Sequence, residues 1–227
     1  MAARHIVFTR RAFNAIVTET LDKHPLETGG IFIGYVLDNG IWVVVETIPP
    51  GIETVNRTAY FEYDAKFINY LSNVVAKQYK GNLQVLGLWH RHPGSMDVFS
   101  STDDETNVQF ARPNAWGAIS GLVNCDPRMR LTMYHVDERC RYTKTEWSVD
   151  DGIIPEELLE LRYTSAESLP VPAGTRTNPA PTAPAPATSA PPAGEPSAAD
   201  AASGAEFTLN DAVAEFGQLC RNLMKLK

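Results

Sequence analysis

Apolar residues along the first two thirds of the chain follow two spacings, one typical of strands and one typical of helices. Short runs rich in β-branched and aromatic residues predict strands at about 27–37, 41–48, 83–90, 116–123, 129–136 and 141–148. Helical spacing predicts one helix between Thr9 and Pro25, a second capped near Asp64 and a third beginning at about Thr102. Strands and helices alternate without a Gly-rich phosphate loop, so the expected class is α/β, with a mixed or curved, antiparallel-rich sheet flanked by helices.

The pattern changes after about residue 165, where the predicted globular domain, residues 1–165, ends. Residues 166–205 are dominated by Pro, Ala, Thr and Ser, which cannot supply a core, so a disordered, semi-extended linker is expected. Residues 206–227 return to helical spacing, with one apolar face formed by Leu209, Val213, Phe216, Leu219, Cys220, Leu223 and Leu226. Because a lone helix of this length is marginal in water, we expect it to dock on a partner protein or a second copy of the chain, with a groove of its own globular domain as the alternative.

The overall composition narrows the classes of function. The 227-residue chain is 44% hydrophobic, which is enough for one good core. Its net charge of −7 arises mainly in residues 150–205, and no basic block is present, so nucleic-acid binding is disfavoured. No apolar run has the length of a membrane span and the N-terminus carries no signal segment, so a soluble, cytoplasmic protein without membrane binding is expected. The three cysteines are scattered, which predicts reduced thiols rather than disulfides or a thiolate metal site.

Two histidines one residue apart, His90 and His92, follow an apolar strand, and Asp103 lies at the start of the next predicted helix. Side chains on a strand repeat with period two, so both imidazoles are expected to point the same way at its C-terminal end. Two neutral imidazoles and one carboxylate can hold zinc and leave its fourth position open, which is typical of a catalytic site. The alternative is that the histidines merely share one face and that Asp103 is an ordinary helix-cap residue. Thr102 and Glu105 resemble a capping box, a role that is compatible with a ligand role of the adjacent Asp103.

Hydrolysis also needs a base that accepts a proton from water, and Glu27 is the best candidate. It opens a nearly continuous apolar strand, so its carboxylate is expected at the strand's edge in a partly dehydrated place, where its pKa rises. The alternative is an ordinary solvated glutamate. Gly29 and Gly30, which follow, would let another backbone come close.

Taken in order, these residues resemble the motif of the JAMM (JAB1/MPN/Mov34) metalloprotease family. Glu27 precedes Thr-Gly-Gly, then comes His90-x-His92-Pro, and seven residues separate His92 from Ser100-x-x-Asp103. The chain is similar in particular to short bacterial JAB-type proteins that resemble deubiquitinases. The resemblance implies the MPN (cytidine-deaminase-like) fold and one Zn²⁺ per chain. It also implies roles for five residues. His90, His92 and Asp103 would bind the zinc, Glu27 would act as general base and acid, and Ser100 would donate a hydrogen bond to the oxyanion.

The resemblance covers roughly residues 4–147 and also implies an activity. This is a zinc isopeptidase or peptidase that cleaves after the C-terminal glycine of a ubiquitin-like protein, to deconjugate or to mature it. In bacteria such proteins often belong to ubiquitin-like conjugation systems, so activating and conjugating enzymes are the implied partners. Two alternatives stay open: a zinc peptidase that processes a ubiquitin-fold sulfur carrier, and an MPN scaffold without catalysis. Iron or manganese in the same ligands is a further alternative.

One position departs from the family pattern. The residue between the two histidines is usually a small hydroxyl residue in the family, and here it is Arg91. Strand alternation predicts that Arg91 points away from the metal ligands. One interpretation is a solvated or salt-bridged arginine, and the other is an arginine that pairs with an acidic group or a substrate carbonyl beside the cleft.

Overall fold

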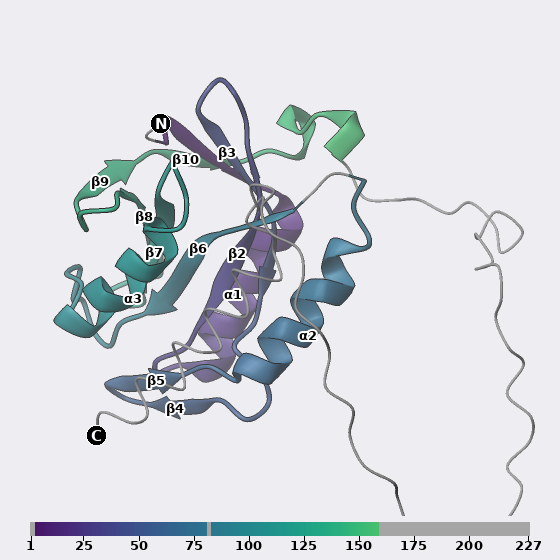
Figure 1. The fold of residues 1–227 in the computed structure, drawn as a ribbon. Coiled ribbons are helices and arrows are strands. Elements are labelled where there is room, and N and C mark those ends of the chain that lie inside the picture. The colour runs from purple at the N-terminus through teal and green to yellow at the C-terminus, as the bar shows by residue number, and fades with distance from the viewer. Residues whose placement is uncertain (1–2, 81–82, 159–227) are drawn as a thin grey trace, which may run out of the picture. The chain divides into compact units, whose positions relative to one another are not determined.

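The computed structural model describes residues 3–80 and 83–158, which form a curved mixed sheet, a separate hairpin and three α-helices (Figure 1). The strands are β1 (His5–Phe8), β2 (Gly29–Val36), β3 (Ile41–Ile48), β4 (Val55–Arg57), β5 (Tyr60–Glu62), β6 (Gln84–Arg91), β7 (Ala118–Asn124), β8 (Arg130–Val136), β9 (Tyr142–Thr145) and β10 (Trp147–Val149). The helices are α1 (Arg10–Lys23), α2 (Ala65–Ala76) and α3 (Ser101–Ala111), and two 3₁₀ turns follow at Asp151–Ile153 and Glu156–Leu158. The α/β class expected from the sequence is confirmed.

The main sheet curls until its two edges are joined by a single residue. Its eight strands lie in the order β10-β1-β3-β2-β6-β7-β8-β9. The edge strands β9 and β10 are neighbours in the sequence, separated only by Glu146. Strand β9 pairs antiparallel with β8, whereas β10 pairs parallel with β1, so the sheet is nearly closed. The single strand predicted at 141–148 is therefore wrong, because the chain there divides between the two edges.

Helices cover both faces of the central strands. On one face, Ala12 and Ile16 of α1 pack among buried strand residues. On the other face, Ile68 and Val75 of α2 and Phe110 of α3 do the same. Strands β2 and β3 are thus buried on both sides, which explains why their sequences are almost continuously apolar rather than alternating.

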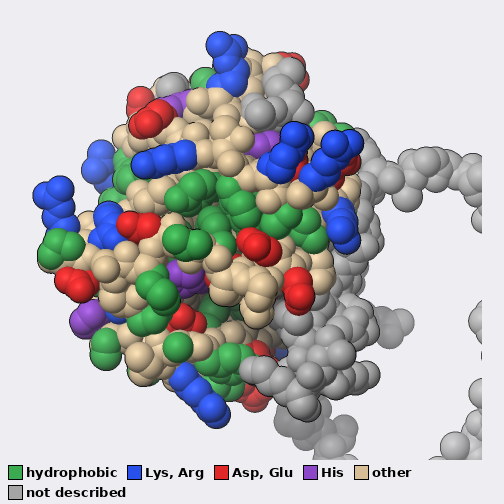
Figure 2. All heavy atoms as spheres, turned by 90° about the vertical axis from the view of Figure 1, so that its left-hand side faces the viewer, with side chains coloured by type: hydrophobic (Ala, Val, Ile, Leu, Met, Phe, Trp, Pro, Cys, Tyr) green, Lys and Arg blue, Asp and Glu red, His purple; other side chains and the backbone are tan. Residues whose placement is uncertain are grey.

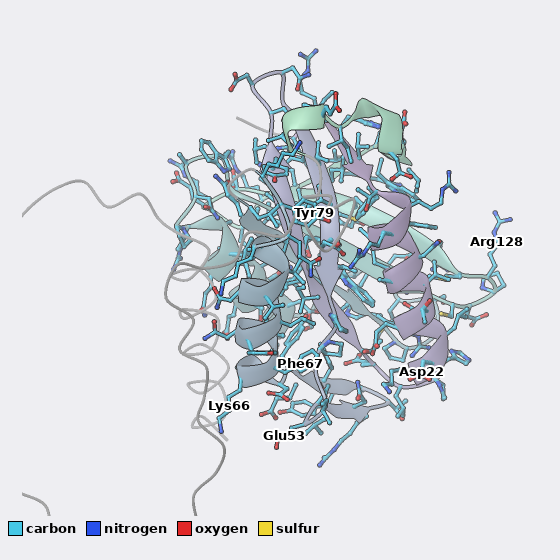
Figure 3. All side chains as sticks on the ribbon, turned by 90° about the vertical axis from the view of Figure 1, so that its right-hand side faces the viewer. Asp22, Glu53, Lys66, Phe67, Tyr79 and Arg128 are labelled. Atoms are coloured by element: carbon cyan, nitrogen blue, oxygen red, sulfur yellow. The ribbon has the colours of Figure 1, made fainter. Side chains whose placement is uncertain are left out.

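The first two helices begin where the sequence predicts. The Thr9 hydroxyl accepts a hydrogen bond from the amide of Ala12, and the Asp64 carboxylate accepts one from the amide of Phe67, each at 3.0 Å. These bonds satisfy amides that the first helical turn leaves without partners. In Figure 3, which looks onto α1 and α2, Phe67 lies on the inner side of α2 and Lys66 extends outward.

Strand β1 and the hairpin of β4 and β5 were not predicted, because strands of three or four residues are too short to show a period. None of the helices in the described part of the chain is long and apolar enough to cross a membrane. The boundary at residue 165, the linker expected at 166–205 and the helix expected at 206–227 lie outside the described residues.

Candidate metal centre

The two histidines lie at the C-terminal end of β6, which runs between β2 and β7. His90 stands opposite Gly29 of β2 and Leu122 of β7. A Cβ atom on Gly29 would clash with the carbonyl oxygen of Trp89, so glycine is required for β2 to pass this close to the histidine strand. The close backbone approach expected from the Gly-Gly pair is therefore confirmed.

Three candidate ligand side chains converge at this strand end. The Nε2 atoms of His90 and His92 are 2.8 Å apart, and they lie 3.3 and 3.2 Å from the two carboxylate oxygens of Asp103. Donor atoms at zinc distances of about 2.0–2.1 Å in tetrahedral geometry are separated by roughly 3.3 Å. The two histidine–carboxylate distances and the donor set fit this ion, whereas the two imidazole nitrogens would have to move slightly apart. Within residues 3–80 and 83–158, these three form the group that could hold a metal. Both histidines are more than nine-tenths buried, which limits competition from bulk water.

The first turn of α3 fixes the Asp103 carboxylate. Its Oδ2 atom accepts a hydrogen bond of 2.7 Å from the amide of Ser100, and the Ser100 hydroxyl accepts one of 3.2 Å from the amide of Asp103. The capping box is therefore formed by Ser100 and Asp103, and the box predicted for Thr102 and Glu105 is wrong. Ser100 is therefore the cap of this helix, and Asp103 is both its partner in the capping box and the carboxylate of the cluster.

The electrostatics of Asp103 keep it ionised. Partial burial alone would raise the pKa of this carboxyl, but the hydrogen bonds to His90 and His92, and the one from the Ser100 amide, hold it well below its usual range. A carboxylate that stays negative is the form that binds a divalent cation.

Glu27 lies between α1 and β2, held by the hairpin that the sequence did not predict. Its amide donates a hydrogen bond of 2.8 Å to the carbonyl of Arg57, and its carbonyl accepts one of 2.8 Å from the side chain of Asn56. Burial raises the pKa of the Glu27 carboxyl to about 7, with a further increase from the charge of Asp103. The neighbouring His92 and Arg91 side chains lower the pKa of Glu27 and so act in the opposite direction. A pKa near neutrality suits a group that both takes up and releases a proton.

Ser100 is the exposed cap of α3 and is hydrogen-bonded to Asp103 in both directions. In these bonds its hydroxyl oxygen acts as an acceptor, so its own proton is available for another acceptor. Its expected role as a donor to an oxyanion stays a prediction.

Arg91 does not fit the interpretation of a solvated or salt-bridged arginine. Its side chain is only 2% exposed, and no carboxylate in the described part of the chain lies within ion-pair distance of it. Instead, its Nη1 donates to the backbone carbonyls of Pro25 and Leu26, and its Nη2 is hydrogen-bonded to Nδ1 of His24 at 3.2 Å. Its partners are thus the chain segment that leads into Glu27 and not an acidic group.

An aromatic cluster supports His90, and sequence reasoning missed it. The ring of Phe99 lies 5.8 Å from that of His90 and stacks on the ring of Tyr142 at 4.5 Å, with Tyr134 packed edge-on at 5.3 Å. Phe99 is close to the motif, but Tyr142 reaches it only through the pairing of β8 with β9. Nothing local in the sequence points to that contact.

The loop between the ligands is fixed on its outer side as well. The side chain of Asn124 donates a hydrogen bond of 2.6 Å to the carbonyl of Met96. Arg130 donates to the carbonyl of Ser95 and to both carboxylate oxygens of Asp97. Figure 2 views the side of the molecule that carries α3, β8 and β9, where hydrophobic side chains lie among basic and acidic ones without a large patch of one sign.

Comparison with known proteins identifies the family to which the chain is similar. Residues 9–134 match a family described as prokaryotic homologs of the JAB domain. No curated protein matches the chain. The solution structure of a protein from Desulfitobacterium hafniense is similar at 15% sequence identity with a TM-score of 0.49, and the match covers 64% of this chain and 92% of that one.

Proposed function

The chain belongs to the prokaryotic homologs of the JAB domain, and from this premise we propose that it is a zinc-dependent metallopeptidase. The observation that carries the proposal is the convergence of His90, His92 and Asp103 on one buried point, with their donor atoms at zinc spacing. A scaffold would not need three polar side chains directed at one another in a place where burial is costly. The family match alone would support the fold but not the chemistry.

The roles of the chain's own residues follow from their environments. His90, His92 and Asp103 would hold the zinc, which, when bound, would supply Lewis acidity toward a peptide carbonyl and lower the pKa of a water. Glu27, whose partly buried carboxyl has a raised pKa in the metal-free protein, would accept a proton from the attacking water and deliver it to the departing amine. Ser100, with its free hydroxyl proton, would donate a hydrogen bond to the oxygen on which negative charge develops.

The substrate class in the proposal is narrower than peptides in general. We propose cleavage after the C-terminal glycine of a ubiquitin-like protein, for deconjugation or maturation. Support comes from the motif, in which Glu27 is followed by Thr-Gly-Gly, and from the exposed apolar side chains of Met96 and Val98 in the loop between the ligands, which a protein substrate could cover. Activating and conjugating enzymes are the proposed partners. A sulfur-carrier substrate would use the same site.

The test combines metal content with cleavage of a ubiquitin-like protein fused through its terminal glycine to a reporter. Glu27→Gln should keep about one zinc per chain and lower the cleavage rate by a factor on the order of 10² to 10⁴. Glu53→Gln is the matched control, because this exposed glutamate in Figure 3 should give the wild-type rate. Absence of zinc binding by the wild-type protein would refute the catalytic proposal and favour a scaffold. If the wild-type protein binds zinc and cleaves a sulfur-carrier fusion but not the ubiquitin-like fusion, the substrate is a sulfur carrier.

A further inference from the structure

Arg91 connects two parts of the site that are far apart in the sequence. It lies between the candidate ligands His90 and His92 on β6. Its backbone amide donates a hydrogen bond of 2.8 Å to the carbonyl of Thr28, directly after Glu27. Because alternate side chains on a strand leave on opposite sides, the guanidinium is directed away from the two imidazoles, toward the segment between α1 and β2. One residue thus contacts the Glu27 segment through both its backbone and its side chain.

The Glu27 segment has no regular secondary structure, so its carbonyl groups need partners from elsewhere. The guanidinium of Arg91 binds two of them, those of Pro25 and Leu26. The carbonyl of Glu27 itself is bound by Asn56. Without the guanidinium, two neighbouring carbonyls immediately before Glu27 would lose these donors, at a site where the arginine side chain is almost completely buried.

We propose that Arg91 is a positioning residue, which holds the segment from His24 to Thr28 against β6 and so fixes the Glu27 carboxylate relative to the metal ligands. This inference rests on the proposed function, in which Glu27 transfers protons. Distances between a base and a metal site matter because small displacements of a reacting group strongly reduce rates. Since β6 carries His90 and leads directly into His92, movement of these ligands and movement of the base are coupled through one strand.

The geometry favours arginine over other residues at this position. A planar guanidinium can donate from one nitrogen to two carbonyls and from another to His24, whereas a lysine ammonium is a single point with a flexible stem. A small hydroxyl side chain, which is usual in the family at this position, would not reach these carbonyls.

The test measures amide hydrogen exchange in the full-length protein, together with zinc content. Arg91→Met keeps the buried apolar stem and removes every donor of the guanidinium. We expect the amides of Leu26 and Glu27, which donate to Lys23 and Arg57, to exchange at least tenfold faster. Zinc should still bind at about one per chain. The matched control is Arg130→Met, which removes a guanidinium that binds the loop at residues 95–97 and should leave these two amides unchanged.

Unchanged exchange at Leu26 and Glu27 in Arg91→Met would overturn the proposal. A uniform acceleration that also includes the amides of α2 and β7 would overturn it too, since it would indicate a general role in the core. If Arg91→Met does not fold, Arg91→Lys decides between the same outcomes, with a smaller acceleration expected at the same two amides. Hydrogen exchange and zinc content can be measured whether or not the wild-type protein cleaves the reporter. A failure of the positioning role is therefore distinguishable from a failure of the proposed activity.

Where cleavage is observed, kinetics provide a second readout. Arg91→Met should lower kcat by ten- to a hundredfold and leave KM within about twofold. In the Glu27→Gln background the same change should have less than a twofold effect, because Arg91 acts through Glu27. Equal effects in both backgrounds would overturn the positioning role.

Discussion

The hydroxyl of Tyr142 donates a hydrogen bond of 2.6 Å to Oδ1 of Asp104, the residue that follows the candidate ligand Asp103. The same tyrosine ring stacks on Phe99, which packs against His90. A single residue of the edge strand β9 therefore supports the helix of one candidate ligand and the ring of another. Burial and the hydrogen bond to Asp104 raise the pKa of Tyr142, so it remains a donor throughout the neutral range.

Replacing Tyr142 with Phe should keep the stacking and remove the hydrogen bonds of its hydroxyl, which donates to Asp104 and accepts from Asn107 and Cys140. We expect the free energy of unfolding to fall by about 1–2 kcal/mol, because bonds to charged groups contribute more than neutral ones. Urea denaturation measures the change. Tyr134→Phe is the control, since Tyr134 contacts the same Phe99 ring but its hydroxyl makes no hydrogen bond to a described residue. A loss of equal size in both variants would contradict the assignment to the hydrogen bonds of the Tyr142 hydroxyl.

The raised pKa of Glu27 predicts that the metal-free protein loses stability as pH increases. The folded-state pKa is about 7 and the reference value is 4.5, so the folded state holds this proton more tightly. Between pH 4.5 and 7 the carboxyl is ionised in the unfolded state but still largely protonated in the folded state, so the free energy of unfolding falls as the pH rises. Above about pH 7 both states are ionised and there is no further fall. Glu27→Gln removes the loss. We expect the variant to match the wild type near pH 4 and to exceed it at pH 8 by on the order of 1 kcal/mol, a figure reduced for solvent screening of a partly exposed group.

Thermal unfolding of EDTA-treated wild type and Glu27→Gln at pH 4, 6 and 8 measures this difference. Glu53→Gln, at an exposed position, should show no such growth with pH. A difference that is the same at all three pH values would show that burial of the ionised carboxylate is not its cause.

The ligand set was predictable because its chemistry lies in residue types at short spacing. His90 lies at the end of a strand, His92 follows it by two residues, and Asp103 lies in the first turn of the next helix. The cap of that helix was not predictable, because Ser100 and Thr102 are both good capping residues and each has an acidic residue three positions later. The hydrogen bonds between Ser100 and Asp103 decide which one caps.

The support of Glu27 could not be predicted for a different reason. Asn56 and Arg57 reach it across about thirty residues, through a hairpin whose three-residue strands show no period and whose turn lacks Asn-Gly. The contact of Arg91 with Pro25 spans 66 residues and needs the pairing of β2 with β6. Contacts of this kind are set by the closed fold and leave no local signature.

Gly29, the first residue of β2, should not tolerate a side chain. A Cβ atom on Gly29 would meet the backbone carbonyl of Trp89, the ring of Phe61 and the hydroxyl of Tyr63. The carbonyl cannot move without breaking the pairing of β2 with β6. We expect Gly29→Ala to cost about 2–3 kcal/mol of unfolding free energy. Gly152→Ala, where the added carbon meets only an exposed side chain, should cost far less. Similar losses in both would show that the strand can shift.

Removal of the Ser100 hydroxyl should have two separable effects. Ser100→Ala removes the cap and should lower the free energy of unfolding by about 1 kcal/mol. If the hydroxyl also serves as the oxyanion donor, the cleavage rate should fall by a further factor of about 10² to 10³, more than the loss of stability explains. Ser101→Ala is the control, because Ser101 is exposed and its hydroxyl makes no hydrogen bond to the described residues. Loss of stability with an unchanged rate would leave Ser100 as a cap alone.

Zinc should stabilise the folded chain because the three donor atoms converge only in the folded state. An ion that binds the native protein alone adds about 2.7 kcal/mol when its concentration is a hundred times its dissociation constant. His92→Ala should remove this increment, since two ligands cannot complete the site. His5→Ala is the matched control: this histidine is bonded to Ser148 at the other end of the sheet and should keep the full zinc shift. Thermal unfolding with and without zinc at pH 7.5 measures both. A zinc shift that survives in His92→Ala would place the metal elsewhere, and a shift missing from the wild type would show that the convergence of these side chains does not create a metal site.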